Sequence, residues 1–411
     1  MAAEIPESDA GAVQGHVDAL ASIREPDEEG WTRRVLTEEA TAARDEVARR
    51  MRSAGLECSV DGAGNLIGLL PGRRGGPAIV TGSHTDTVLG GGRYDGTVGV
   101  FGAIEAVEAL ARAGIRLDHD LVVVDFYGEE ANSFGLSCLG SRAVAGNLKP
   151  SHLDRTDPGG RSLGEAMAAH GIDPHAALTC DWRSRGLKAF VELHIEQGPT
   201  LESSGCAIGI VSTIAGISRA EVTFHGRRDH AGTMPIALRH DAACAAAESI
   251  LAAERLGQDG GISVTGRISV LPGAANVVPE TAQLTVEFRS PDSEWMGDRR
   301  AVFDEAARQS GERRGVGVSI EWISDEPPVR MTDSAAGAIA AAARAAGRPT
   351  MKLPSGAGHD TVHMASLTSV GMIFIPSHNG RSHCPEEFTD ASDIVSGIQV
   401  LAHTLVELDR S

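Results

Sequence analysis

Side chains of the types that bind metal ions follow several apolar, strand-like runs along this chain. Five sets stand out: His84 with Asp86, Asp95 in a glycine-rich loop, Glu129 with Glu130, His194 with Glu196, and His383. In an open parallel sheet, the carboxyl ends of the strands converge on one crevice, so we expect the five sets to meet there. Histidines, paired glutamates and an aspartate able to bridge suit zinc or a similar divalent ion, bound twice. The pattern therefore indicates a two-metal hydrolase.

Two of these sets suggest a division of roles between neighbouring side chains. Asp86 lies two residues after His84, on the same face of a strand, and could accept the second ring N–H of that histidine. The simpler alternative is a solvated histidine beside a turn aspartate. Adjacent Glu129 and Glu130 point apart, so we assign Glu130 as a metal ligand and Glu129 as the general base. An acidic turn is the alternative for this pair.

The last set lies in a loop with competing candidates. His378 is a second histidine near His383 and a competing ligand candidate. Glu386 or Glu387 could supply a carboxylate that orients the ligand without binding the metal itself. Cys384 is interpreted as a small filler next to His383, because soft cysteine sites usually come in clusters. Any one of these residues alone would be weak evidence, and the inference depends on all five sets following strand-like runs.

Composition restricts the partners of the protein. The chain has 411 residues, 42% hydrophobic and 23% charged, with a formal net charge of −19. An acidic protein is not attracted to nucleic acid or to an anionic membrane, so we expect neither as a partner, although the charge does not choose a substrate. The N-terminus lacks the apolar core of a signal peptide, and no run reaches the roughly 18–20 apolar residues of a membrane span. Six scattered cysteines predict reduced thiols and a cytoplasmic location.

The order of apolar patterns predicts an α/β fold. We expect helices over 36–55, 99–114 and 333–346, and strands over 121–127 and 370–376. Such alternation predicts a mainly parallel sheet with helices on both faces.

A middle segment follows a different pattern and contains none of the five sets. Its expected order is β-α-β-β-α-β, a ferredoxin-like α+β arrangement, with elements at 219–225, 236–256, 262–270, 281–288, 295–313 and 316–323. We therefore predict a catalytic domain in two parts, 1–212 and 328–411, interrupted by an inserted domain at 213–327.

The ordered motifs resemble the hydantoinase/carbamoylase amidohydrolases, which belong with the di-zinc aminopeptidase and aminoacylase-type hydrolases. The resemblance spans about residues 15–405 and rests on these stretches: 82–86, 94–96, Glu129-Glu130, 194–198, 356–360 and 382–383. It implies one metal ion on His84, Asp95 and His194, and another on Asp95, Glu130 and His383. Zinc is the expected ion, with manganese, cobalt or nickel as alternatives. Glu129 is implied as the base, with Asp86 as a catalytic partner.

The resemblance also implies roles for residues of the inserted domain. Arg289 and Asn276 would hold the substrate carboxylate, because arginine offers a bidentate fork. His230 would bind substrate and stabilise the oxyanion of the tetrahedral intermediate. Gln197 and Gly358 are implied as further substrate contacts. In the family the inserted domain is a lid that also builds a homodimer.

The reaction implied is hydrolysis of a linear amide in a ureido acid, such as an N-carbamoyl-L-amino acid, to amino acid, carbon dioxide and ammonia. Allantoate amidohydrolase activity is the nearest alternative, followed by dipeptidase or aminoacylase activity. A catalytically silent metal-binding scaffold is a different class, and the intact Glu129 argues against it. Two departures from the family pattern stand out: Ser133 replaces a common arginine, and Glu287 replaces a common aspartate.

Overall fold

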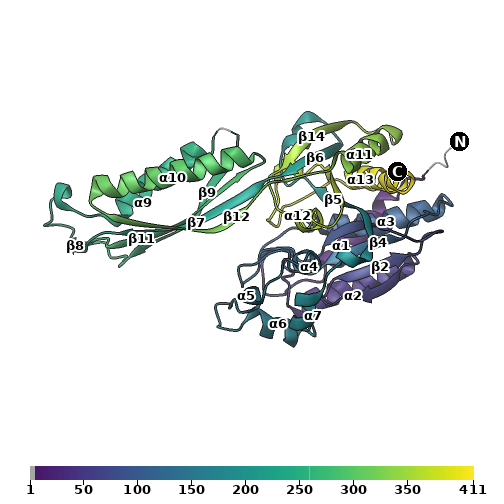
Figure 1. Ribbon diagram of the computed structural model, residues 1–411, viewed down its shortest axis with the longest axis horizontal. Helices are drawn as coiled ribbons and strands as arrows, with labels where there is room; N and C mark the ends of the chain where they lie inside the picture. The colour runs from purple at the N-terminus through teal and green to yellow at the C-terminus, as the bar shows by residue number, and fades with distance from the viewer. Residues whose placement is uncertain (1–4, 259) are drawn as a thin grey trace. The chain divides into compact units, whose positions relative to one another are not determined.

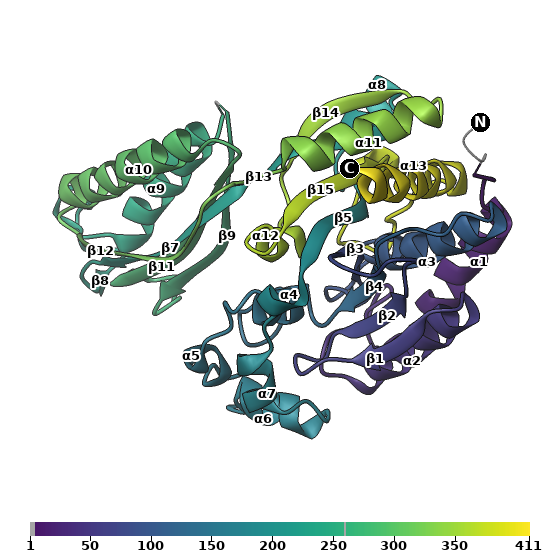
Figure 2. The same cartoon turned by 45° about the vertical axis from the view of Figure 1, so that its right-hand side comes forward.

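The computed structural model describes residues 5–258 and 260–411 and divides into two compact units. The first contains residues 1–212, 331–353 and 358–411, and the second contains residues 213–330 and 354–357. The first four residues of the predicted catalytic domain lie outside the described part of the chain. Figures 1 and 2 show the elements of each unit.

The first unit is built on the nine-stranded sheet, in the order β1-β2-β4-β3-β5-β15-β6-β13, with β14 beside β6. The strands of this sheet are β1 (Glu57–Val60), β2 (Leu66–Leu70), β3 (Ala78–His84), β4 (Leu121–Phe126), β5 (Leu187–Ile195), β6 (Ile208–Ile214), β13 (Val329–Arg330), β14 (Thr350–Ser355) and β15 (Ser369–Ile375). The residues of β13 and the last residues of β6 and β14 are counted with the second unit. The central strands β4, β3, β5 and β15 are parallel, whereas β1, β2 and β6 pair antiparallel. The prediction of a mainly parallel sheet is confirmed for the strands that precede the candidate ligands.

Helices cover this sheet and share its hydrophobic core. The longer ones are α1 (Ala10–Ala21), α2 (Glu38–Ser53), α3 (Thr97–Arg112), α11 (Asp333–Ala345) and α13 (Ala391–Arg410). Thr37 caps α2 as its sequence suggests, because its side chain accepts from the backbone N–H of Ala40. Among the described residues, no helix is both long enough and apolar enough to cross a membrane.

Residues between β4 and β5 form a layer of short helices that the apolar pattern did not predict. They are α4 (Leu139–Val144), α5 (Pro150–Leu153), α6 (Leu163–Ala169), α7 (Pro174–Thr179) and the 3-10 turn η1 (Arg183–Arg185). Their apolar side chains form a separate small core that includes Phe134, Leu139 and Leu163. The short helix α8 (Thr200–Ser204) follows β5, α12 (Thr361–Met364) precedes β15, and η3 (His378–Gly380) follows it.

The second unit has the predicted β-α-β-β-α-β order. Its antiparallel sheet has the order β12-β7-β11-β9, and Figure 2 shows α9 and α10 side by side against it. The elements are β7 (Gly216–His225), β8 (Asp229–His230), η2 (Ile236–Leu238), α9 (Ala242–Leu256), β9 (Ile262–Leu271), β10 (Val277–Val278), β11 (Thr281–Ser290), α10 (Ser293–Arg314) and β12 (Gly317–Glu326). The helix expected from 236 begins at Ala242, because Asp241 caps it by accepting from the N–H of Cys244.

Gly82 in β3 provides a test of the central sheet. Its φ is +147°, and an added Cβ would lie 1.9 Å from the carbonyl oxygen of Val124 in β4. We expect Gly82→Ala to lower the free energy of unfolding by about 3 kcal/mol or more, because strain and overlap add. Gly337→Ala in α11 is the control, because its Cβ would meet nothing within 4 Å. Denaturant unfolding of both variants should separate them, and equal stabilities would contradict this account of β3.

Candidate metal centre and active site

The candidate ligands lie along one edge of the parallel strands. His84 ends β3, His194 is the penultimate residue of β5, and Glu129 and Glu130 follow β4 closely. Because β4, β3, β5 and β15 are neighbours, the strand ends present these side chains on the same edge of the sheet. His383 comes from the loop after β15, where its φ is +55°.

One group of ligand atoms surrounds one oxygen of Asp95. The Nε2 of His194 lies 3.1 Å from Asp95 Oδ1, and the Nε2 of His84 lies 3.9 Å from the same oxygen. All three side chains are buried, and their ligand atoms lie within 4.8 Å of one another. A tetrahedral zinc site with ligands at 2.0–2.1 Å places ligand atoms roughly 3.3 Å apart, so this spacing fits a divalent cation.

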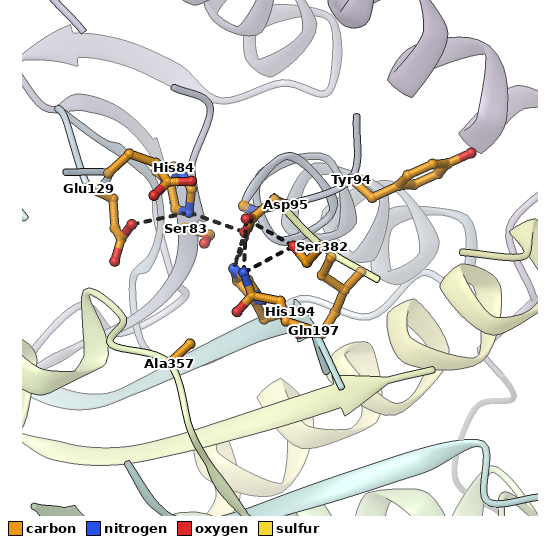
Figure 3. Close-up of polar contacts among 12 residues, drawn as sticks. Ser83, His84, Tyr94, Asp95, Glu129, His194, Gln197, Ala357 and Ser382 are labelled. Atoms are coloured by element: carbon orange, nitrogen blue, oxygen red, sulfur yellow. Dashed lines mark hydrogen bonds and ion pairs between the residues drawn. The ribbon is translucent and has the colours of Figure 1, made fainter. Parts of the chain in front are cut away.

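A second group surrounds the other oxygen of Asp95. His383 Nε2 lies 3.1 Å from Asp95 Oδ2 and 3.5 Å from Glu130 Oε1. Figure 3 shows Asp95 between the side chains of His84, His194 and Gln197. The two carboxylate oxygens of Asp95 therefore face different candidate ligand sets, as a bridging ligand requires.

Backbone carbonyls orient both buried histidines of the first group. The Nδ1 of His84 lies 3.1 Å from the main-chain oxygen of Asp86, and the Nδ1 of His194 lies 2.9 Å from that of Ile195. A ring N–H at Nδ1 donates to each carbonyl, so a ring that loses a proton to bind a metal ion loses it from Nε2. That nitrogen faces Asp95 in both cases, which is the orientation that a metal ligand needs.

Several buried carboxylates lie close together at this site, and burial and neighbouring charges shift their pKa values. Burial and the nearby Asp95 carboxylate raise the pKa of Glu130 to about 8. Burial also raises the pKa of Glu129 well above 4.5, and His84 opposes that shift. Burial disfavours the charge of Asp95, but hydrogen bonds with His194 and His383 hold its pKa well below 3.8. Clustered carboxylates beside imidazoles are a donor set suited to divalent cations, which would displace the imidazole protons.

Asp86 holds the backbone that carries the two glutamates. Its Oδ1 accepts from the N–H of Glu129 and its Oδ2 from the N–H of Glu130, both at 3.1 Å. Its carboxylate lies 3.6 Å from His84 Nδ1, farther than its own main-chain oxygen. The main partner of the His84 ring N–H is therefore the backbone carbonyl of Asp86, not its carboxylate as expected.

Glu387 is the supporting carboxylate of the last loop. It is buried, and its Oε1 accepts from the backbone N–H groups of Tyr94 at 2.9 Å and Asp95 at 3.0 Å. Its Oε2 accepts from the hydroxyl of Ser382. Glu387 thus ties the Asp95 loop to the His383 loop, whereas Glu386 pairs with Arg381 at the surface.

The competing histidine of this loop lies away from both groups. The Nδ1 of His378 lies 2.9 Å from the Glu202 carboxylate, and its side chain is 54% exposed.

Gln197, expected at the substrate, donates its Nε2 to Asp95 Oδ2 at 2.8 Å and to Ser382 Oγ at 3.3 Å. In this structure Gln197 contacts the shared carboxylate directly.

The remaining predicted residues lie outside the two ligand groups. His230 is in β8, and its Nδ1 accepts from the N–H of Gly232 at 3.0 Å. Asn276 precedes β10, and its main-chain oxygen accepts from the N–H of Ala231. Arg289 donates its Nε to Glu287 Oε1 at 2.6 Å and its Nη1 to the carbonyl of Gly356 at 2.9 Å. These three residues belong to the second unit, whereas Gly358 belongs to the first.

Sequence reasoning assigned no role to His359 and Asp360, which the fold places beside the ligands. The buried ring of His359 meets that of His194 edge-on, with centroids 4.5 Å apart. Asp360 accepts from the hydroxyl of Ser141 at 2.5 Å. A third group of ligand-type atoms joins His359 to His194 and Glu192. Ser83 and Thr361 already donate to the Glu192 carboxylate, so this group suits a cation less well.

Cys138 is a further contact that the sequence did not indicate. Its Sγ lies 3.4 Å from Glu129 Oε1, and its backbone N–H donates to the Glu129 carbonyl at 2.8 Å. Nine positions separate the two residues, and only the turn before α4 brings them together.

The mainly parallel sheet and the paired groups of ligand-type residues at its strand ends are features of a hydrolase. Residues 78–407 match the profile of peptidase family M20/M25/M40, and the chain belongs to this family.

Relatives that are described as amidohydrolases indicate which kind of hydrolase this chain is. The chain is 38% identical over 382 residues to an N-carbamoyl-L-amino acid amidohydrolase of Geobacillus stearothermophilus, covering 92% of this chain and 93% of that one. It is 34% identical to the allantoate amidohydrolase of Escherichia coli, covering 97% of both. A hydantoinase/carbamoylase family amidase from Burkholderia multivorans has a similar structure, with a TM-score of 0.88, 31% identity, and 98% and 99% of the chains covered. The prediction of an amidohydrolase of this family is confirmed.

Proposed function

We propose that the protein hydrolyses the linear C–N amide bond of a ureido acid, most simply an N-carbamoyl-L-amino acid. The observation that carries the proposal is Asp95, whose two oxygens face separate histidine groups beside the buried Glu129. The products are an amino acid, carbon dioxide and ammonia. The named function of the Geobacillus relative supports this substrate class.

The proposed ligands form two sets that share one residue. His84, Asp95 and His194 would hold one divalent ion, and Asp95, Glu130 and His383 would hold the other, with zinc as the expected metal. Ions bound there would supply polarisation of a carbonyl oxygen and a lower pKa for water. The Nε2 atoms and the carboxylates described above fit zinc, which binds nitrogen and oxygen donors readily.

Glu129 performs the proton transfers of the proposed reaction. Its Oε2 lies 3.7 Å from His84 Nε2, so it faces the first ligand group. It takes a proton from the attacking water and delivers a proton to the departing nitrogen, so that water adds across the C–N bond. Asp86 fixes the backbone on which Glu129 stands, and Cys138 contacts its other oxygen.

A screen of related substrates tests this proposal. Metal-reconstituted protein is incubated with N-carbamoyl-L-amino acids, allantoate, β-ureidopropionate and dipeptides, and ammonia and amine release are measured. We expect turnover of carbamoyl amino acids, with chelators abolishing it. The second candidate is allantoate hydrolysis, favoured by the similarity to the Escherichia coli enzyme. Faster hydrolysis of dipeptides than of any ureido compound would contradict the proposal.

Arg289 is proposed to bind the substrate carboxylate, supported by the way Glu287 and Gly356 fix its guanidinium. We expect Arg289→Ala to raise KM for carboxylate substrates about 10- to 100-fold, since a charged hydrogen bond contributes about 1.5–3 kcal/mol. A neutral amide analogue should lose much less. Arg308→Ala is the control, because Arg308 is an exposed residue of α10 that pairs with Asp304 one turn away. Equal losses on both substrates would indicate a structural role.

The inserted segment 213–327 is proposed as a lid that binds substrate through His230 and Asn276 and builds a homodimer. The edge strand β9 supports the dimer, because Ile262, Val264, Ile268 and Leu271 are each more than half exposed. Long apolar edge strands tend to pair with another chain. We expect a dimer by sedimentation equilibrium and a shift to monomer in Ile268→Lys. A monomeric wild-type protein would contradict the proposal.

We also infer that the protein acts in the cytoplasm. The support is that its six cysteines, each in the described part of the chain, are all free thiols.

A further inference from the structure

A cavity of about 280 Å³ opens beside the second ligand group, within the first unit. Asp86 and Glu130 form one wall, so the cavity begins where the proposed reaction occurs. Its other walls come from residues 34–37, Thr87, Leu89, residues 131–134 and Arg161. For comparison, a protein cavity of roughly 150 Å³ admits benzene, so this cavity can take a substantial side chain.

Part of the cavity lining is apolar. Leu36 and Phe134 are nearly buried at 8% and 5% exposure, and they belong to the small core beneath the short helices. Leu89 is 58% exposed and forms part of the same lining. These side chains suit the hydrocarbon stem of a substituent.

Two arginines line the cavity, and they differ in how fully they are paired. Arg34 donates from Nε and Nη2 to Glu25 and also from Nη2 to Glu28, so its charge is balanced twice. The closest charged contact of Arg161 joins its Nε to Asp157 Oδ2 at 3.5 Å. Neither terminal nitrogen of Arg161 makes a hydrogen bond to a described residue. Arg161 therefore keeps a free guanidinium fork in the cavity lining.

Apart from the Glu130 carboxylate, which belongs to the second ligand group, the other polar groups of the lining leave donors and few acceptors. Both Asp86 oxygens accept backbone N–H groups, and the side-chain oxygen of Asn132 accepts from Phe134 and Leu136. Within the described chain, the hydroxyl of Ser133 makes no hydrogen bond. A partner for this lining needs an acceptor, and a carboxylate matches a guanidinium fork best.

We infer that this cavity is the specificity pocket for the substituent on the substrate's Cα, and that it selects an acidic side chain with an apolar stem. The inference rests on the proposed ureido-acid hydrolysis and names the subclass of substrate. N-carbamoyl-L-glutamate is the simplest compound of that subclass. Arg161 is then the specificity-determining residue, and Leu89 lines the path of the stem.

The test compares N-carbamoyl derivatives of L-glutamate, L-glutamine and glycine, because the first two differ mainly in charge. We expect wild-type protein to favour the glutamate derivative over the glutamine derivative about tenfold in kcat/KM, since one charged contact is gained. Arg161→Gln should bring that ratio close to one. Arg74→Gln removes the same charge from an exposed position outside the cavity and should keep the wild-type ratio.

Leu89→Trp provides a second, steric test that leaves every charge in place. It should lower kcat/KM for both long derivatives about tenfold or more relative to the glycine derivative. A wild-type ratio of one or less, or an unchanged ratio in Arg161→Gln, would overturn the pocket assignment while glycine turnover still supports the proposed function. Absence of turnover with all three compounds would refute the proposed function, and the pocket assignment with it.

Discussion

Replacing Glu129 by Gln is expected to lower kcat about 10³-fold while leaving the bound metal unchanged. General acid–base groups contribute roughly 10²- to 10⁴-fold, and glutamine cannot accept or return a proton. Glu129 is buried, and its two oxygens contact Cys138 and face His84. Glutamine has nearly the same shape, so the ligand groups should keep their geometry. Steady-state kinetics and elemental analysis on the same preparation measure both quantities.

The neighbouring Glu130 supplies the matched control for this substitution. Glu130→Gln removes a carboxylate that lies 3.5 Å from His383 Nε2, so it should weaken the second ion as well as the rate. The two variants differ by one position and carry the same chemical change. A near-normal kcat in Glu129→Gln, or equal metal loss in both variants, would show that Glu129 is not the base.

Replacing Asp95 by Asn is expected to remove both ions and to lower activity at least as far as Glu129→Gln. Asp95 is 4% exposed, and its two oxygens face His194 and His383 separately. An amide presents one oxygen and no charge, so it cannot serve both groups. Without the negative charge, the surrounding histidines would also lose their common partner.

A comparison of single ligands sharpens this prediction. Of the two Asp95 oxygens, His84 lies near Oδ1, at 3.9 Å, so His84→Ala should weaken one ion more than the other. Metal content after dialysis, measured across a range of free zinc concentrations, distinguishes the two patterns. If Asp95→Asn retained one tightly bound ion per chain, Asp95 would not be the shared ligand.

The strands that carry the site could be predicted because they are buried on both faces. The runs at 78–83 and 121–127 are mostly apolar and buried throughout, and polar ligands follow them abruptly. The antiparallel strands β1 and β2 were not predicted, because β1 has only four mostly exposed residues and β2 only five, too few to show a clear periodicity. The helices α4 to α7 were missed for a related reason. Each has only four to seven residues, too few to show a helical apolar face.

The sequence predicted the candidate metal ligands better than the residues that contact and position them. His84, Asp95 and His194 share a place at the strand ends, which the order of the sequence makes visible. Cys138 and Asp360 meet the site only through the turn before α4 and the loop before α12. Choosing Glu387 over Glu386 required knowing which side chain points at the Asp95 loop.

The most direct test of the account is a zinc-soaked crystal examined by anomalous diffraction at the zinc edge. We expect two peaks per chain, about 3.5–4 Å apart, with one oxygen of Asp95 beside each. One should be bound by His84 and His194, and the other by Glu130 and His383. A single peak, or a peak held by Glu192, His194 and His359 instead, would contradict the shared-aspartate site on which the proposed function depends.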